Sequence, residues 1–347
     1  MNIIPVEEKW LRLAEERQLR LTKPPRSLGR LEEIANRFAA IQQTETPAVR
    51  HPMIIVFAGD HGVCEEGVNP YPQVVTSQMV SNFLRGGAAI NVLGHAAGAG
   101  LMIVDVGVAH DIPFTNGLID RKIARGTQNF CRLPAMTSDQ ASSALSVGME
   151  MVDRAVHEGS NLIGIGEMGI GNTTVASALT AALTGLPPVA VVGRGTGADD
   201  GCLERKIATV TKALALHKPS ALGVMDLVRT IGGFEIAAMT GACLQAALHR
   251  CAIVVDGFIA TVGAALAVRI EPAVQSYLFA AHRSTEVGHD PLLEIIQQKP
   301  ILDLNMRLGE GTGAALAIPI IRAAAEALSC MATFDAAGVS DAEYGLK

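Results

Sequence analysis

The chain has 347 residues and is rich in apolar side chains, with 49% hydrophobic, 18% charged and only 4% aromatic residues. This length suffices for one large α/β domain and a smaller appendage with a large, tightly packed core. A net charge of −6 without a basic stripe argues against nucleic acid as a partner.

Several features of the sequence predict a cytoplasmic location. No apolar run is long and uninterrupted enough to span a membrane, and the N-terminus lacks the pattern of a signal peptide. The six cysteines are scattered, and no pair has the C-x-x-C spacing of a zinc or redox site. We therefore expect reduced, mostly buried thiols and no metal centre.

The predicted elements begin with two helices, over residues 6–20 and 31–42. From about residue 53, short apolar runs alternate with longer Ala-rich runs. The predicted strands are 53–57, 101–106, 161–165, 189–192, 252–255, 277–280 and 301–304. This alternation predicts an α/β fold with a doubly wound, mostly parallel sheet and helices on both faces. In such folds ligands bind at the carboxyl ends of the strands.

The two ends of the chain are helical in pattern, and the middle alternates between strand and helix. We predict that residues 1–45 together with 320–347 form a small helical domain. Residues 46–319 would then form one large α/β domain, because no internal repeat or low-complexity linker interrupts them.

The loop after the first predicted strand carries the first polar side chains of interest, in Ala58-Gly-Asp-His-Gly-Val63. Asp60 and His61 could take part in catalysis or bind a metal. No second ligand stands at a recognisable spacing, so the pattern favours a structural turn.

A glycine-rich loop, residues 164–174, joins a predicted strand to a predicted helix. Gly164, Gly166 and Gly169 match the G-x-G-x-x-G pattern, which alone would indicate a nicotinamide-dependent dehydrogenase. The acidic residue expected about 20 positions later is missing, and Glu167 inside the turn would repel a pyrophosphate.

The far end of this loop is better suited to a single phosphate, because backbone N–H groups at a helix N-terminus bind anions. The residues concerned are Gly169, Gly171, Asn172, Thr173 and Thr174. A second glycine-rich loop contains Gly193 and Gly195, and Lys206 lies on the helix that follows, within reach of the same phosphate. An ordinary tight turn and a solvated helix lysine are the alternatives.

The stretch Met306-Arg-Leu-Gly-Glu-Gly-Thr-Gly313 is the most informative one. Glu310 lies between Gly309 and Gly311 at the start of a predicted helix, where glycines permit a tight turn and a close ligand. The helix dipole should stabilise its charged form. Glu310 is thus placed to take a proton from a small ligand. The alternative is a helix-start acid with only a dipole role.

Together these loops resemble one family, the nicotinate-nucleotide–dimethylbenzimidazole phosphoribosyltransferases of cobamide lower-ligand activation. The matching segments run in the family's order over nearly the whole chain. They are residues 23–31, 58–63, 85–91, 166–174, 231–234, 239–241, 256–258 and 306–313.

The resemblance implies a phosphoribosyltransferase without cofactor or metal. Phosphoribose would pass from nicotinate mononucleotide to 5,6-dimethylbenzimidazole or a related benzimidazole or phenol, which gives an α-linked nucleotide and nicotinate. Glu310 would be the general base and Glu167 a second catalytic carboxylate. The implied nucleotide and phosphate site comprises Gly169, Gly171, Asn172, Thr173, Thr174, Gly193, Gly195, Lys206, Ser284, Glu286 and Gly288. The implied partner is a second copy or a paralogous subunit.

The acceptor site implied by the resemblance comprises Asp60, Tyr71, Gln78, Met79 and Leu308. Met79 stands where some relatives place a glutamine, and Tyr71 stands where some have a smaller serine. The sequence therefore leaves the acceptor open. Two other functions stay open as well, a nicotinamide-dependent dehydrogenase and a non-catalytic scaffold subunit.

Overall fold

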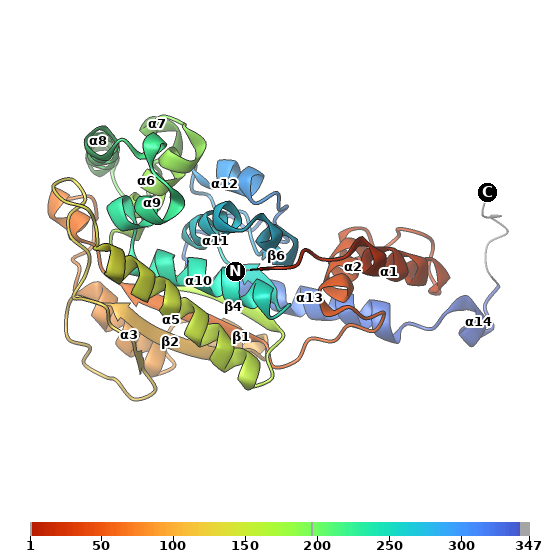
Figure 1. Ribbon diagram of the computed structural model, residues 1–347. Helices are drawn as coiled ribbons and strands as arrows, with labels where there is room; N and C mark the ends of the chain where they lie inside the picture. Colours follow the sequence, from red (N-terminus) through yellow and green to blue (C-terminus); the bar gives the residue numbers. More distant parts are fainter. Residues whose placement is uncertain (1, 196, 341–347) are drawn as a thin grey trace.

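The fold is that of a computed structural model, which describes residues 2–195 and 197–340. Its core is one six-stranded sheet in the order β3-β2-β1-β4-β5-β6, and every neighbouring pair is parallel (Figure 1). The strands are β1 (Met53–Gly59), β2 (Gly100–Gly107), β3 (Ile119–Asp120), β4 (Leu162–Met168), β5 (Ala252–Val255) and β6 (Leu278–Ala280). The predicted α/β class with a parallel sheet is confirmed.

The central strands are mostly apolar because helices cover both faces of the sheet, and their charged residues, Asp105 of β2 and Glu167 of β4, lie near the carboxyl ends. In β1, the side chains of Ile54, Val56 and Phe57 are completely buried. The helices of this unit are α3 (Val75–Leu84), α4 (Ala89–Ala96), α5 (Ser138–His157), α6 (Asn172–Thr184), α7 (Pro188–Val191), α8 (Asp200–His217), α9 (Val224–Ile231), α10 (Phe234–Leu248), α11 (Phe258–Ile270), α12 (His289–Ile295) and α13 (Thr312–Cys330).

The two faces of the sheet can be assigned from close contacts. Gly59 of β1 faces Glu235 of α10, and α5 packs against α10. Ile54, which points the other way along β1, meets α4 at Gly94 and α13 near Gly311. Helices α10 and α13 therefore cover opposite faces, as a doubly wound sheet requires.

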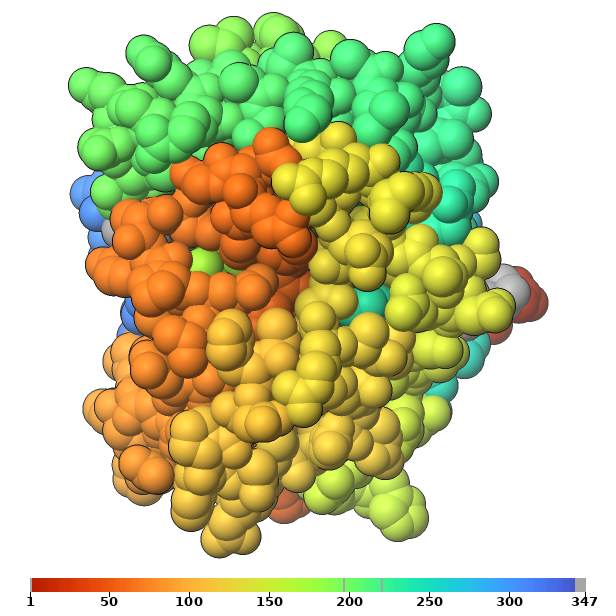
Figure 2. All heavy atoms as spheres, turned by 90° about the vertical axis from the view of Figure 1, so that its left-hand side faces the viewer, coloured from red at the N-terminus to blue at the C-terminus, as the bar shows by residue number. Residues whose placement is uncertain are grey.

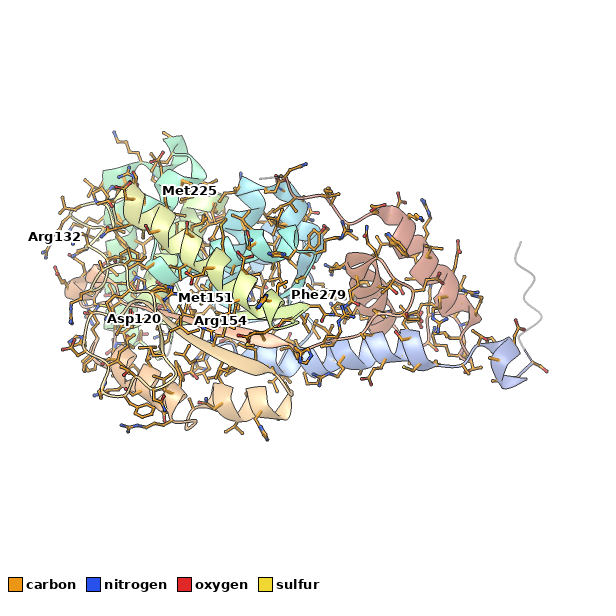
Figure 3. All side chains as sticks on the ribbon, turned by 60° about the horizontal axis from the view of Figure 1, so that its bottom comes forward. Asp120, Arg132, Met151, Arg154, Met225 and Phe279 are labelled. Atoms are coloured by element: carbon orange, nitrogen blue, oxygen red, sulfur yellow. The ribbon has the colours of Figure 1, made fainter. Side chains whose placement is uncertain are left out.

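A helical appendage extends away from the sheet (Figure 1). It consists of α1 (Glu8–Arg20), α2 (Arg30–Gln42), the end of α13, and α14 (Phe334–Ala337). Arg17 ties α1 to α13, since its Nε donates to the carbonyl of Leu328 at 2.8 Å. Phe279 of β6 lies at the end of the sheet nearest the appendage (Figure 3). The guanidinium carbon of Arg37 on α2 lies 4.5 Å from the centroid of its ring.

The predicted division into residues 1–45 with 320–347 and residues 46–319 stays a prediction, and 341–347 lie outside the described residues. Helix α13 runs unbroken through both units. Among the described helices it alone has the length and hydropathy of a membrane span. Half of that window is buried inside the protein, as in the core helix of a globular domain.

Two predicted strands are wrong. Residues 189–192 belong mostly to helix α7, because Pro188 at its first position pre-sets a helical φ angle. Residues 301–304 form no strand, and only a single parallel bridge joins Leu302 to His282. The two-residue strand β3 was not predicted, since its sequence gives no apolar run.

Candidate active site

A cleft opens at the carboxyl ends of β4, β5 and β6. It lies beside the point where the strand order reverses, between β1 and β4, which is where ligands bind in sheets of this kind. Figure 2 looks onto this end of the molecule, and atoms from the region of β4 and α6 show through an opening in the segment that follows β1.

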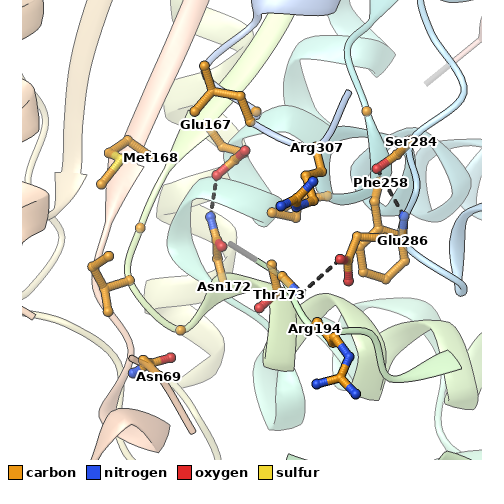
Figure 4. A pocket seen from close by; sticks show the side chains of 18 of the residues that line it. Asn69, Glu167, Met168, Asn172, Thr173, Arg194, Phe258, Ser284, Glu286 and Arg307 are labelled. Atoms are coloured by element: carbon orange, nitrogen blue, oxygen red, sulfur yellow. Dashed lines mark hydrogen bonds between the residues drawn. The ribbon is translucent and has the colours of Figure 1, made fainter. Parts of the chain in front are cut away.

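Most of the predicted site residues line this cleft (Figure 4). They are Glu167, Gly169, Gly171, Asn172, Thr173, Gly195, Lys206, Ser284, Glu286, Tyr71 and Leu308. The others lie behind or beside the lining, namely Glu310, Thr174, Gly193, Gly288, Asp60, Gln78 and Met79. The structure thus brings the loops after β4 and β6 together with the loop that precedes α13.

The loop after β4 packs closely against the neighbouring backbone. A Cβ on Gly169 would lie 2.2 Å from the carbonyl oxygen of Gly59, so only glycine fits there. Gly171 has a φ of +96° and begins α6, which aims the N-terminus of that helix at the cleft. Asn172 and Thr173 follow directly, and this geometry suits an anionic group.

Lys206 is buried, not a solvated helix lysine, with an exposed fraction of only 2%. Its Nζ donates to the carbonyl of Gly193 at 2.8 Å and to Oγ1 of Thr173 at 3.1 Å. Burial lowers the pKa of Lys206, and the nearby Glu286 opposes that shift. An ammonium has three donors, so one remains for a ligand in the cleft.

Glu286 organises the opposite wall. Its Oε1 accepts a hydrogen bond from the N–H of Gly195 at 2.9 Å, and its own N–H donates to Oγ of Ser284 at 3.3 Å. Burial raises the pKa of Glu286, and Lys206 acts against that effect. Gly193 and Gly288 allow close packing here. A Cβ on Gly193 would clash with Glu286, and a Cβ on Gly288 would clash with Phe258.

Glu310 is held in an unusual backbone conformation. Its φ is +64°, and those of Gly309 and Gly311 are both +83°. A non-glycine residue in this region is uncommon and costs about 1 kcal/mol. The N–H of Glu310 donates to the carbonyl of Glu167 at 3.2 Å, and a Cβ on Gly166 would come within 2.3 Å of the Gly311 nitrogen. Close packing against β4 therefore fixes the turn.

The electrostatics of Glu310 differ from the expectation that the helix dipole stabilises its charge. Asp256 occupies the N-terminus of α13, where it accepts N–H groups of Gly311 at 3.1 Å and Gly313 at 2.6 Å. Burial, followed by repulsion from Asp256, raises the pKa of Glu310 to about 7. Its Oε2 is buried without a hydrogen-bond partner among the described residues. A carboxylate of this kind is suited to general-base catalysis near neutral pH.

Glu167 lies within β4, not in the turn after it as the sequence suggested. Its carboxylate accepts a hydrogen bond from the side-chain amide of Asn172. Burial, and then the charges of Asp256, Glu235 and Glu310, raise the pKa of Glu167 well above its usual range. A raised pKa favours the protonated form of Glu167, which is the form that can donate a hydrogen bond in the cleft.

The predicted acceptor residues are not gathered together. Tyr71 and Leu308 line the cleft and are 51% and 49% exposed. Asp60 is buried and stabilises a turn, because it accepts from Oγ1 of Thr76 at 2.7 Å and from the N–H of Ala109 at 2.8 Å. Gln78 is exposed on α3, and Met79 packs against the core. Their acceptor roles stay predictions.

Several lining residues were not assigned a role from the sequence. They include Asn69, Arg194, Asp256, Phe258 and Arg307. Asp256 directly follows β5, and this position at a strand end was the signal in the sequence that could have pointed to it. The pairing of Asp256 with the N-terminus of α13 could not be read from either segment alone.

A buried histidine–carboxylate pair packs behind the loop after β4. His61 and Glu235 are completely buried, and Nε2 of His61 lies 3.1 Å from Oε1 of Glu235. Burial alone would lower the pKa of His61, but Glu235 and Asp60 outweigh it and raise that pKa. A Cβ on Gly169 would approach Nε2 of His61 to 3.2 Å, so this pair packs directly under the loop.

Comparisons with known proteins agree with this geometry. A family model described as a phosphoribosyltransferase matches residues 3–339. The chain is 50% identical over 343 residues to nicotinate-nucleotide–dimethylbenzimidazole phosphoribosyltransferase of Geobacter sulfurreducens, a match that covers 99% of this chain and 97% of that protein. For the protein of the same name from Chloroflexus aggregans, the identity is 48% over 340 residues, or 98% of this chain and 96% of that protein.

Solved structures give the same result. The crystal structure of nicotinate-nucleotide–dimethylbenzimidazole phosphoribosyltransferase from Thermus thermophilus has a TM-score of 0.92 at 47% identity. That match covers 97% of this chain and 100% of the other. The likeness therefore extends through the sheet, the cleft and the appendage, and the chain belongs to the nicotinate-nucleotide–dimethylbenzimidazole phosphoribosyltransferase family of pentosyltransferases.

Proposed function

We propose that this enzyme transfers phosphoribose from nicotinate mononucleotide to 5,6-dimethylbenzimidazole or a related benzimidazole or phenol, in the activation of a cobamide lower ligand. The observation that carries the proposal is Glu310, a buried carboxylate whose Oε2 has no hydrogen-bond partner among the described residues and whose pKa is about 7. The substrates are those that give its relatives their name, extended to phenols by the exposed apolar side chains of the cleft.

The donor's phosphate would bind to the N-terminus of α6 and to Lys206. Both are rigidly held, since Lys206 is anchored by Thr173 and Gly193. The ribose would then lie across the cleft, with its C1′ carbon near Glu167 and Glu310. Holding both ring systems in line supplies much of the rate, because the reaction becomes effectively unimolecular.

In the reacting complex the acceptor nitrogen or oxygen attacks C1′ from the face opposite nicotinate. Glu310 takes the N–H or O–H proton of the acceptor as the new bond to C1′ forms. The electron pair of the broken C1′–N bond returns to the pyridine ring, which leaves as nicotinate. Attack from the opposite face inverts the β-linked donor and yields an α-linked nucleotide.

The nicotinamide-dependent dehydrogenase is less well supported. In dinucleotide-binding folds an acid that binds the ribose follows the second strand. Here the segment after α6 leads into helix α7 and the Gly193 loop, with no such acid. The scaffold alternative is disfavoured by the intact set of Glu310, Glu167 and Lys206.

We further propose that the protein acts in the cytoplasm as a homodimer or with a paralogous subunit. All six cysteines are free, which fits a reducing compartment, and the dimer follows from the family resemblance. Light scattering of the purified chain should give twice the monomer mass. A monomer that becomes active only with a paralogue would favour the heteromeric form.

The deciding experiment incubates the purified chain with nicotinate mononucleotide and a panel of benzimidazoles, phenols and purines, with mass spectrometry of the products. Release of nicotinate together with an α-linked nucleotide is the expected result. Glu310→Gln provides the control for background chemistry. If the chain released no nicotinate, or only hydrolysed the donor whatever acceptor was present, the proposal would be wrong.

A further inference from the structure

Three cationic side chains line the cleft, and two of them are already engaged. Lys206 donates to Gly193 and Thr173 as described. Arg194 pairs with the carboxylate of Asp200 and donates from Nη1 to the carbonyl of Ala198 at 3.0 Å. Arg307 makes neither a hydrogen bond nor an ion pair from its guanidinium within residues 2–195 and 197–340. An exposed cation is thus left available in the cleft for a ligand.

The position of Arg307 places its charge beside the reacting centre. It lies three residues before Glu310, on the loop whose Met306 carbonyl accepts the N–H of Thr285 at 3.2 Å. Figure 4 shows its side chain reaching into the space between Glu167 and Asn172 on one side and Ser284 and Glu286 on the other. Backbone hydrogen bonds therefore hold the loop that carries Arg307 at both ends, to β4 at Glu310 and to the segment after β6 at Met306.

The cleft otherwise presents carboxylates, because Glu167, Asp256 and Glu286 all line it. An anionic ligand needs a counter-charge for each anionic group that it brings. The donor of the proposed reaction carries two such groups at opposite ends, the 5′-phosphate and the carboxylate of the pyridine ring. Lys206 and the N-terminus of α6 serve the first, and nothing described so far serves the second.

We propose that Arg307 binds the ring carboxylate of the donor and so selects nicotinate mononucleotide over its amide, nicotinamide mononucleotide. This inference rests on the proposed function. A guanidinium matches a carboxylate with two parallel N–H donors, whereas the neutral amide offers one oxygen and an NH₂ group that faces the cation unfavourably.

The contact gains strength during the reaction. In the donor, the positive pyridinium nitrogen partly offsets the ring carboxylate. When the C1′–N bond breaks, its electron pair neutralises that nitrogen, and the acceptor's proton passes to Glu310. The leaving nicotinate then carries an uncompensated negative charge. An interaction that is stronger in the transition state than in the bound donor raises the rate of transfer. Arg307 is therefore a specificity-determining residue that also assists departure of the ring.

The test compares kcat/KM for three donors, nicotinate mononucleotide, nicotinamide mononucleotide and nicotinate riboside, in the full chain and its variants. For Arg307→Gln we expect a loss on the order of 10- to 100-fold with both nicotinate donors and little change with the amide donor. The preference for acid over amide should collapse. Arg307→Lys should keep part of that preference, because the charge remains while the paired donors are lost.

A matched control is Arg283→Gln, since Arg283 lies on the neighbouring loop, pairs with Asp290 at 2.6 Å and does not line the cleft. Its donor preference should equal that of the unmodified chain. An equal loss for acid and amide donors with Arg307→Gln would overturn the proposal. A loss confined to the phosphorylated donors would also overturn it and assign Arg307 to the phosphate. Absence of transfer by the unmodified chain would instead refute the proposed function itself.

Discussion

Two parts of the cleft, which we call the donor half and the acceptor half after the substrates proposed for them, are built on different principles. The donor half, around α6, Lys206 and Glu286, consists of buried polar groups that are bonded to one another. The acceptor half presents Tyr71 and Leu308, whose large side chains are about half exposed and make no side-chain hydrogen bond in the described part of the chain. A phosphate and a ribose need directed polar contacts, whereas a flat ring needs only an apolar surface. We therefore expect the donor half to be intolerant of change and the acceptor half to be adjustable.

Because Glu310 is the proposed general base, its loss should have the largest effect. Glu310→Gln keeps the size of the side chain but removes the proton acceptor, and kcat should fall by about 10²–10⁴-fold. Neither donor nor acceptor affinity should change much. Steady-state kinetics with nicotinate mononucleotide and 5,6-dimethylbenzimidazole give kcat and the KM of each substrate for the variant and the unmodified chain. A variant with near-normal kcat would mean that another group takes the proton.

The pH dependence should report the same carboxylate. Because the pKa of Glu310 is about 7, kcat/KM should fall about tenfold for each pH unit below that value and level off above it. The stability of the fold should change with pH in the opposite direction to the activity. The native state binds this proton more tightly than the unfolded chain, so the free energy of unfolding declines as pH rises from about 4.5 to about 7.

That decline is on the order of 3 kcal/mol for a shift of this size. Glu310→Gln should remove it, although Glu167 and Asp256, whose pKa values are also raised, leave part of the slope in place. Urea unfolding at pH 5 and pH 8 gives the comparison. If the variant kept the full slope, the raised pKa would belong to the other carboxylates.

The donor half is tested by Lys206→Ala. A charge-assisted hydrogen bond is worth roughly 1.5–3 kcal/mol, so KM for nicotinate mononucleotide should rise on the order of 10- to 100-fold. KM for the acceptor and the kinetics with nicotinate riboside should hardly change. Lys212→Ala is the control, because Lys212 lies on the same helix but is exposed, 3.5 Å from Glu66. Equal losses with the nucleotide and the riboside would exclude contact with the phosphate.

More of the residues predicted for the donor half than of those predicted for the acceptor half line the cleft, for a physical reason. Glycine spacing and a helix start leave a local pattern, so the Gly169–Thr174 loop and the cradle of Glu310 could be recognised. Burial depends on segments far apart in the chain and leaves no such pattern. Lys206 looked as if it could be a solvated lysine, and the pKa of Glu310 was expected to fall because nothing local revealed Asp256 or the close packing of Gly166.

The same limit explains the wrong strands. Residues 189–192 are apolar and three of the four are valines, as in a strand, yet two prolines before them start a short helix. In the acceptor half, Gln78 and Met79 were placed in the site by resemblance alone, and their helix turns them outward or toward the core. Exposed apolar residues such as Tyr71 and Leu308 occur singly on many surfaces, so they give little signal.

The acceptor half should show the smallest and most selective effects. Leu308→Gln adds a polar group at the edge of the cleft, so it should shift preference toward nitrogen heterocycles by on the order of 10-fold and leave the KM for the donor unchanged. Met79→Gln, expected from the resemblance to act in the same direction, should act more weakly because Met79 lies outside the lining. Adenine should be a poor acceptor for the unmodified chain, since its extra polar groups would lack partners. Competition among 5,6-dimethylbenzimidazole, a phenol and adenine, read by product mass, measures all three. If Met79→Gln changed the preference more than Leu308→Gln, the acceptor would sit deeper, toward α3, and the contrast between the halves would have to be redrawn around Met79.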